Sequence, residues 1–168
     1  MAQVSEQLAG DHAALDEILK QLQTALRDSN IEVAHVKLDL FWARLAVHIR
    51  AEHLHLFPAV LSNLENEAIV TELREDHDFF MGQLALAIQI MRELSTLPDR
   101  LIVPEGLDNV KKIVLEVEQR LVKHNELEES TIYRSTSIRL NPEEQAQLAT
   151  RITMELRKHP PRFTLSTW

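Results

Sequence analysis

The stretch HIRAEHLHLFP, residues 48–58, places three histidines and a glutamate close together in an otherwise apolar segment. Residues four positions apart stack on one face of a helix, so His48 and Glu52 are expected to converge on one point. His53 is one step round from Glu52, which predicts a place at the surface or beside the site. His55 lies about two turns from His48 and is expected to be partly exposed, or at most a neighbour of the site. The motif is therefore H-x-x-x-E, and not the H-E-x-x-H of zinc proteases.

A second copy of this motif occurs later in the chain. HNELEESTIYR, residues 124–134, shares the pattern H-x-x-x-E-x-x-x-[LI]-[FY] with the first stretch. LAGDHAAL, residues 8–15, and LREDHDFF, residues 73–80, likewise share L-x-x-D-H. The sequence thus predicts two copies of a helix pair, in which the first helix supplies D-H and the second supplies H-x-x-x-E.

Apolar residues recur at spacings of three and four in four long segments, which predicts four amphipathic helices. Breaks are expected at 27–30, around 62–66 and across 95–106, the last containing two prolines and a glycine. The apolar faces comprise Leu8, Leu15, Leu19, Leu22 and Leu26; Leu38, Phe41, Leu45, Leu56 and Ala59; Leu73, Phe80, Leu84, Ala87 and Met91; and Val110, Val114, Val117, Leu121 and Ile132.

A fifth helix is predicted over about 142–158. Asn141 is its expected N-cap, Pro142 its first residue, and Glu144 stands where a capping box needs a carboxylate. The fold class is therefore all-α: an up-down-up-down four-helix bundle with an additional C-terminal helix and a tail. We expect residues 1–168 to form a single domain with its core at about 5–135.

The composition excludes several classes of function. The 168 residues carry a formal charge of −8, which argues against nucleic acid and gives no reason to expect an anionic membrane surface. There is no cysteine, so disulfides, iron–sulfur ligation and thiol catalysis are excluded. The first residues do not resemble a secretory signal, and no stretch is apolar enough to span a membrane, so a cytoplasmic location is expected.

Each apolar face is interrupted by histidine or glutamate. Both residue types are costly to bury alone, and a single core histidine is usually only hydrogen-bonded. Six such interruptions spread over four helices need a shared partner, and a cation neutralises the carboxylates while using the imidazole lone pairs. The candidate metal ligands are His12, His48, Glu52, His77, His124 and Glu128.

The duplication predicts how these ligands are shared. A pseudo-twofold axis would give each of two metals two histidines, with both carboxylates bridging. This set is richer in nitrogen than ferritin-type sites, which favours iron or another first-row metal over magnesium or calcium. His35 lies roughly 20 Å along the helix from His48, and His159 lies in the tail, so both are expected outside the site.

The order H … H-x-x-x-E … H … H-x-x-x-E over a four-helix bundle resembles the hemerythrin-like (HHE cation-binding) domains, over about residues 5–135. The resemblance implies two iron ions with an oxo or hydroxo bridge. The four histidines would be terminal ligands, with Glu52 and Glu128 bridging the irons. Zinc, nickel or manganese are possible substitutes.

The sequence departs from this family at three places. Oxygen-carrying hemerythrins have a fifth histidine one turn from that of the third helix, where this chain has Leu73 and Met81. His53 replaces the second acid of H-x-x-x-E-E, which Glu129 retains in the other copy. The iron–sulfur repair branch usually adds a cysteine-bearing N-terminal segment, whereas this chain has no cysteine.

Three functions stay open at this point. The first is a di-iron protein that binds O2, NO or a related small molecule for sensing, carriage or scavenging. The second is a di-iron oxidoreductase that decomposes peroxide or reduces NO, and the third is an iron storage or donation protein. Phe57 and Tyr133, five residues beyond each glutamate, could shield the metals from water or simply pack the core. Beyond a small diatomic or peroxide ligand, the only partner left open is a second copy of the chain in a homodimer.

Overall fold

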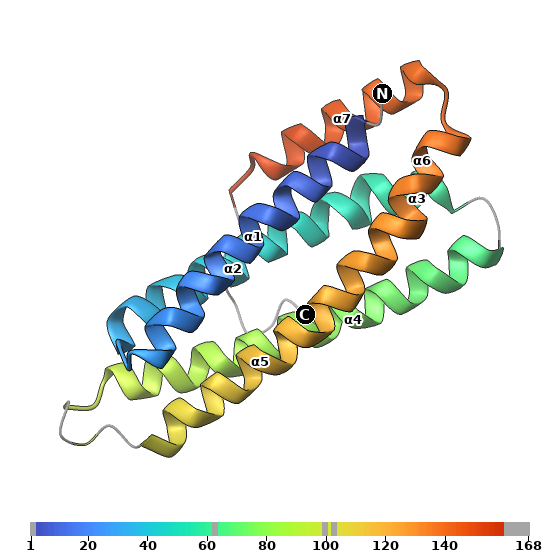
Figure 1. The fold of residues 1–168 in the computed structure, drawn as a ribbon. Helices are drawn as coiled ribbons and strands as arrows, with labels where there is room; N and C mark the ends of the chain where they lie inside the picture. Colours follow the sequence, from blue (N-terminus) through green and yellow to red (C-terminus); the bar gives the residue numbers. More distant parts are fainter. Residues whose placement is uncertain (1–2, 62–63, 99–100, 102–103, 160–168) are drawn as a thin grey trace.

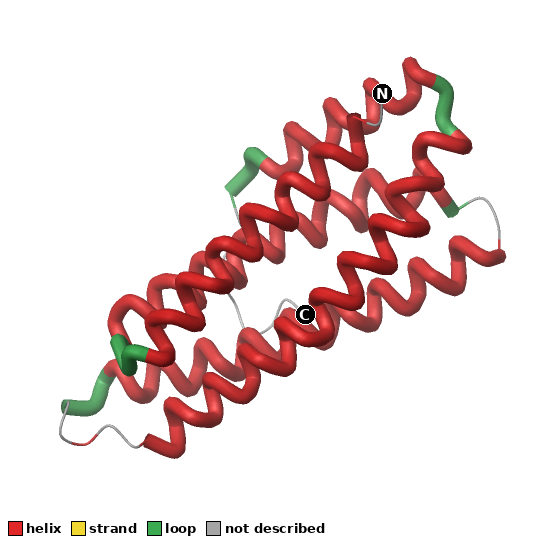
Figure 2. The backbone as a smooth tube through the Cα atoms, viewed as in Figure 1, coloured by secondary structure: helices red, strands yellow, loops and turns green. Residues whose placement is uncertain are grey.

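The computed structural model describes residues 3–61, 64–98, 101 and 104–159, and these fold into helices joined by short connections (Figures 1 and 2). Four long helices form the bundle: α1 (Gln3–Arg27), α2 (Ile31–Ala51), α4 (Leu64–Ser95) and α5 (Pro104–Leu127). Each packs on the next, and α5 returns to α1, so the four close into a ring. Successive helices run in opposite directions (Figure 1), which confirms the predicted up-down-up-down bundle.

The connections follow the local chemistry of the sequence. Asn30 caps α2 by accepting a hydrogen bond from the N–H of Val33 over 3.1 Å. Ser29 before it has a φ of 54°, which lets the chain reverse within a few residues. The predicted break at 27–30 is therefore real. The break predicted across 95–106 is also present but ends earlier, because α5 begins at Pro104, and the break predicted around 62–66 ends where α4 begins at Leu64. Residues 62–63, 99–100 and 102–103 lie outside the described residues.

The additional C-terminal helix is α7 (Pro142–Leu156), two residues shorter than predicted. The side chain of Asn141 accepts from Glu144, and Glu144 accepts from the backbone of Asn141, so the predicted capping box is present. Helix α7 packs on α1 and α2 and buries Leu148 and Ile152 there.

A short π-helix follows α2 and another follows α5, each beginning at a glutamate. The first is η1 (Glu52–Leu56), continued by α3 (Phe57–Val60), and the second is η3 (Glu128–Tyr133), continued by α6 (Arg134–Arg139). The wider turn shifts the helical phase, so Val60 is buried while Ala59 is only half-buried. Ala59, predicted on the apolar face, still packs against the smaller apolar cluster. π-Helical turns occur frequently at functional sites.

The apolar interior consists of two clusters separated by a polar layer. The larger cluster includes Leu15, Leu45 and Leu121, and the smaller includes Leu8 and Leu56. The histidines and glutamates that interrupt the apolar faces lie between them in the sequence of every bundle helix. The fold thus places this polar layer inside the bundle, away from either end.

Candidate metal centre

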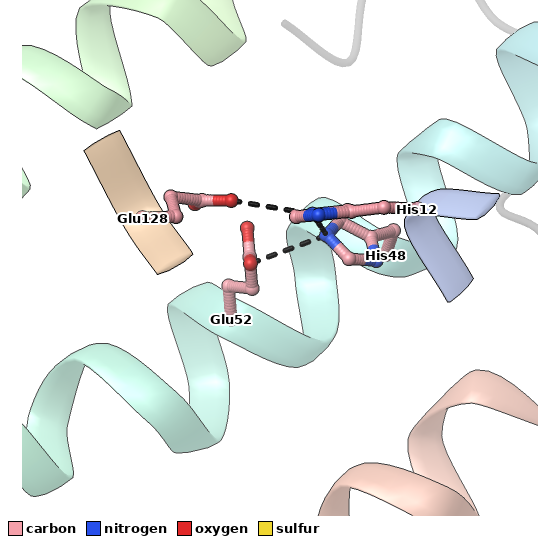
Figure 3. A group of neighbouring side chains, drawn as sticks. All are labelled: His12, His48, Glu52 and Glu128. Carbon is pink, nitrogen blue, oxygen red and sulfur yellow. Dashed lines mark hydrogen bonds and ion pairs between the residues drawn. The ribbon is translucent and has the colours of Figure 1, made fainter. Parts of the chain in front are cut away.

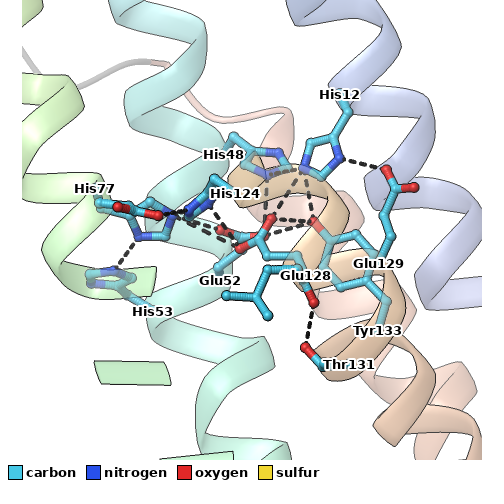
Figure 4. A network of polar contacts seen from close by, with 12 residues as sticks. His12, His48, Glu52, His53, His77, His124, Glu128, Glu129, Thr131 and Tyr133 are labelled. Atoms are coloured by element: carbon cyan, nitrogen blue, oxygen red, sulfur yellow. Dashed lines mark hydrogen bonds and ion pairs between the residues drawn. The ribbon is translucent and has the colours of Figure 1, made fainter. Parts of the chain in front are cut away.

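The structure brings all six candidate ligands together in the polar layer. The side chains come from every bundle helix and from the first residue of each π-helix (Figure 4). None is more than 5% exposed. Two overlapping groups, each with its ligand atoms within 4.8 Å of one another, could hold metal ions: His12, His48, Glu52 and Glu128; and Glu52, His77, His124 and Glu128.

The first group, here called the first donor set, is shown in Figure 3. The Nε2 atoms of His12 and His48 lie 3.1 Å apart. His48 Nε2 lies 3.2 Å from Glu52 Oε1, and His12 Nε2 lies 3.4 Å from Glu128 Oε2. Two ligands at right angles on a metal, each about 2.1 Å from it, are about 3.0 Å apart. The observed spacing is therefore compatible with atoms that share one ion.

The second donor set repeats these distances. The Nε2 atoms of His77 and His124 lie 3.1 Å apart. His77 Nε2 lies 3.3 Å from Glu52 Oε2, and His124 Nε2 lies 3.3 Å from Glu128 Oε1. Each glutamate therefore turns one oxygen to each donor set, which is the arrangement that bridging between two ions requires.

Two of these carboxylate oxygens lack a hydrogen-bond donor within the part of the chain that the structure describes. Glu52 Oε2 and Glu128 Oε1 are buried and accept no hydrogen bond among the described residues, although both lie near imidazole nitrogens. A buried carboxylate oxygen without a donor is costly, and a cation at the second donor set would remove that cost. The residues present therefore fit a bound metal.

A hydrogen bond to Nδ1 orients each of the four imidazoles. His48 Nδ1 lies 2.8 Å from Asp11 Oδ2, and His124 Nδ1 lies 3.0 Å from Asp76 Oδ2. When the Nδ1–H donates to the carboxylate, Nε2 keeps a lone pair directed at the donor set. Such carboxylate–histidine pairs fix the tautomer of metal-binding histidines.

An arginine one helical turn before each of these histidines holds the aspartate in turn. Arg44 donates to Asp11 Oδ1 over 3.0 Å, and Arg120 donates to Asp76 Oδ1 over 2.5 Å. The repeated motif is therefore R-x-x-x-H-x-x-x-E, paired with D-H on the neighbouring helix. The sequence contained this longer repeat, and extending the alignment of the two copies by four residues would have found it.

The other two histidines have different Nδ1 partners. His12 Nδ1 lies 3.0 Å from Glu129 Oε1, and His77 Nδ1 lies 2.9 Å from His53 Nε2 (Figure 4). Burial, together with the neighbouring charges of His77 and Arg74, lowers the pKa of His53 to about 4, so its ring is neutral and can accept. Of the two predicted places for His53, at the surface or beside the site, the structure shows the second.

The charges of the metal-free site are mutually stabilising. Burial alone would raise the pKa of Glu52, but His48 and His77 outweigh it and lower that pKa well below its usual value. Burial likewise opposes charge on His48, yet Glu52 and Asp11 raise its pKa well above 6.5. A proton on His48 therefore balances the charge of Glu52 where no metal is bound.

A family profile, the hemerythrin HHE cation binding domain, matches residues 3–135 of this sequence. The chain belongs to the hemerythrin HHE family. The match covers the four bundle helices and both H-x-x-x-E motifs, and it confirms the resemblance drawn from the motifs. Comparison with curated proteins gave no significant match. For the hemerythrin-type chain described here, cation binding is thus supported by both the family and the buried His/Glu cluster.

The remaining histidines lie away from the donor sets. His35 lies near Asp39 and Ser95, and His55 is partly exposed and lies 3.6 Å from Glu155 Oε2 on α7. His159 is exposed. Among the described helices, none combines the length and apolar character needed to cross a membrane.

The sequence predicted that Tyr133 could shield the metals or pack the core, but it did not predict that the hydroxyl group reaches the candidate ligands. Its hydroxyl is buried and lies 2.9 Å from Glu52 Oε1, 3.1 Å from Glu128 Oε2 and 3.0 Å from His12 Nε2. An α-helix would turn the residue five positions after Glu128 about 140° away from it. The π-helix η3 brings Tyr133 back onto the face of Glu128.

Proposed function

We propose that the protein is a non-heme di-iron binding protein that binds O2, NO or a related small molecule for sensing, carriage or scavenging. One ion would occupy each donor set, held by His12 and His48 or by His77 and His124, with Glu52 and Glu128 bridging. The observation that carries this proposal is the pairing of the carboxylates, each of which turns one oxygen to each histidine pair.

The chemistry of the donors favours iron. Imidazole with carboxylate suits first-row transition metals, whereas magnesium and calcium prefer oxygen alone. Zinc, nickel or manganese could occupy the same donors, because ligand type narrows the choice of metal without fixing it. Bound iron would supply reversible redox chemistry and a coordination position for a small molecule.

The surrounding residues prepare the site without reacting themselves. Asp11, Asp76, Glu129 and His53 hold the Nδ1 side of the four imidazoles, so each Nε2 is directed inward before a metal arrives. The two apolar clusters border the polar layer on either side, and its six candidate ligands are at most 5% exposed. Such burial limits access to small molecules and strengthens every electrostatic contact inside.

An oxidoreductase that decomposes peroxide or reduces NO is the second candidate. Leu73 and Met81, where a fifth histidine of oxygen carriers would stand, are both fully buried apolar residues. The second donor set therefore has fewer nitrogen ligands than an oxygen carrier. The third candidate, iron storage or donation, requires that the metal leave readily.

Two measurements test these functions. Elemental analysis of protein produced with iron available should give about two irons per chain, and one or none would contradict the two-metal proposal. The reduced protein should then be exposed to air while its visible spectrum is followed. A reversible oxygenated species supports carriage, one-way oxidation supports sensing or storage, and catalytic loss of added peroxide supports the enzyme.

A further inference from the structure

We propose that the phenol oxygen of Tyr133 is a fifth protein ligand of the metal in the first donor set, which makes the two metals unequal. This inference rests on the proposed function, because it requires a metal at that position. It assigns to Tyr133 a direct role that goes beyond shielding or packing.

The distances place the phenol oxygen among the ligand atoms. Tyr133 Oη lies 3.0 Å from His12 Nε2, 2.9 Å from Glu52 Oε1 and 3.1 Å from Glu128 Oε2 (Figure 4). These are three of the four donor atoms of the first set. Ligands that share one ion at about 2.1 Å are about 3.0 Å apart. The oxygen therefore stands at the spacing of another donor to the same ion.

The balance of hydrogen-bond donors and acceptors also points to a cation. His12 Nδ1 faces the carboxylate of Glu129, so the tautomer that donates there leaves Nε2 as an acceptor. Tyr133 Oη is then surrounded by three acceptors: one imidazole nitrogen and two carboxylate oxygens. The phenol has a single proton to donate, and His48 Nε2, which lies 3.2 Å from Glu52 Oε1, can supply one more, so two donors face three acceptors. A metal ion at their centre would satisfy these acceptors and the phenol oxygen together.

Among the residues that the structure describes, the second donor set has no equivalent oxygen. Phe57 occupies the position that corresponds to Tyr133, five residues after Glu52, and its ring stacks on His77 with centroids 6.0 Å apart. Tyr133 stacks on His12 in the same way, with centroids 5.6 Å apart. The two rings are thus related by the internal repeat, and only one carries a hydroxyl. The metal of the second set would keep the position that a small molecule can occupy.

Ligation changes the protonation of the phenol. In the metal-free protein, the phenol proton is donated to a bridging carboxylate. On binding iron(III), an Fe–O bond forms, the O–H bond breaks and the proton passes to solvent, with no change in oxidation state. An iron(III)–phenolate bond absorbs visible light by charge transfer from the phenolate ring to the metal, so it is directly observable.

The test compares ferric wild-type protein with Tyr133→Phe, and uses Phe57→Leu as the matched control. Wild type and Phe57→Leu should show the charge-transfer band, with phenolate ring modes enhanced in resonance Raman spectra. Tyr133→Phe should lose both while keeping about two irons per chain by elemental analysis. Phenylalanine preserves the buried ring, and circular dichroism checks that the variants are folded.

The possible outcomes distinguish failure of Tyr133 ligation from failure of the di-iron proposal. Wild-type protein with two irons but no phenolate modes, or Tyr133→Phe that retains them, would overturn ligation by Tyr133 and leave the di-iron proposal intact. Wild-type protein that takes up no iron at all would overturn both.

Discussion

The two halves of the bundle share a frame and differ in what surrounds it. The first half (α1 with α2) and the second (α4 with α5) each combine D-H with R-x-x-x-H-x-x-x-E, and their ligand atoms are spaced almost identically. The differences lie in the residues that contact the ligands. Glu129 faces His12 where His53 faces His77, and Tyr133 stands where the other half has Phe57. The repeated frame gives the two donor sets nearly the same ligand spacing, and their neighbours would make two bound ions unequal under the proposed function.

The two halves also differ in their cover. Helix α7 packs across α1 and α2, where Arg44 donates to the backbone carbonyl of Leu156 and Arg50 to the buried Glu155. Between α4 and α5 the surface instead carries a groove of about 930 Å³, whose lining includes Asp76, Arg120 and His124. The second donor set is therefore the one with its supporting residues at an open groove.

The largest effect is expected at the residues common to both donor sets. Glu128→Ala removes an oxygen from each set, so both ions should be lost rather than one. Glu129→Ala, one residue further on, removes only a partner of His12 and should leave about two irons per chain when iron is abundant. Bound iron and oxo-bridge absorbance measure both. Loss of iron from Glu129→Ala with retention in Glu128→Ala would show that the assigned helical phase is wrong.

The second largest effect is expected in thermal stability, which should be higher for metal-loaded than for metal-free protein. Free metal at about 1,000 times its Kd stabilises the fold by about 4 kcal/mol, which raises the melting temperature by roughly 10 °C in a chain of this size. Calorimetry with and without metal measures the difference. Equal melting temperatures would mean that the six side chains do not hold a metal in the folded state.

The pH dependence should separate the two forms further. Glu52 and Asp11 raise the pKa of His48, and Glu128 raises that of His124, above the ordinary 6.5. Their stabilisation of the metal-free protein is complete below pH 6.5 and is lost as the pH rises through the raised values. The lowered pKa values of Glu52 and Glu128 contribute above about 4.5 and are lost as the pH falls through them.

The pKa of His53, lowered to about 4, makes the folded state bind fewer protons than the unfolded state below pH 6.5, so the metal-free protein should be most stable near pH 6.5 and lose stability on either side. Metal must displace the imidazole protons, so its binding should strengthen as the pH rises and fail in acid. Melting temperatures of both forms on either side of pH 6.5 would measure the gap. A gap that narrows above pH 6.5 would contradict the assigned charges.

The aspartates test whether the shared frame is equivalent in the two halves. Asp11→Asn and Asp76→Asn keep an oxygen that can accept from Nδ1–H but lose the negative charge. Each should weaken metal affinity by about 10–100-fold, and by similar factors. Competition with a chelator measures the affinities. An effect confined to one variant would show that the two aspartates do not support their histidines equally.

The smallest effect is expected at the unequal neighbours. His53→Ala removes a neutral partner of His77 and should weaken affinity by no more than about 10-fold, the lower end for such residues. Glu129→Ala removes a charged partner of His12 and should cost more, because hydrogen bonds to ionised groups are stronger. The same chelator titration compares them. A larger loss in His53→Ala would reverse the proposed difference between the halves.

The sequence by itself determined the helical bundle and which side chains face its interior. Spacings of three and four set the helix faces, and a buried histidine or glutamate in such a face is conspicuous because it is costly without a partner. His48 with Glu52, and His124 with Glu128, could be paired because both spacings span one turn of a regular helix. The capping box at Asn141 was equally local and was predicted correctly.

Only the tertiary structure decided how the ligands are held and what else reaches them. The partners of Nδ1 come from neighbouring helices, so Asp11 and His48 are 37 residues apart in the chain and no local spacing links them. The π-helices that begin at Glu52 and Glu128 change the helical phase of every residue after them, so Val60 is more deeply buried than Ala59. The same shift brings Tyr133 to the donor atoms, because a wider turn places the fifth residue, and not the fourth, back on the face of the glutamate.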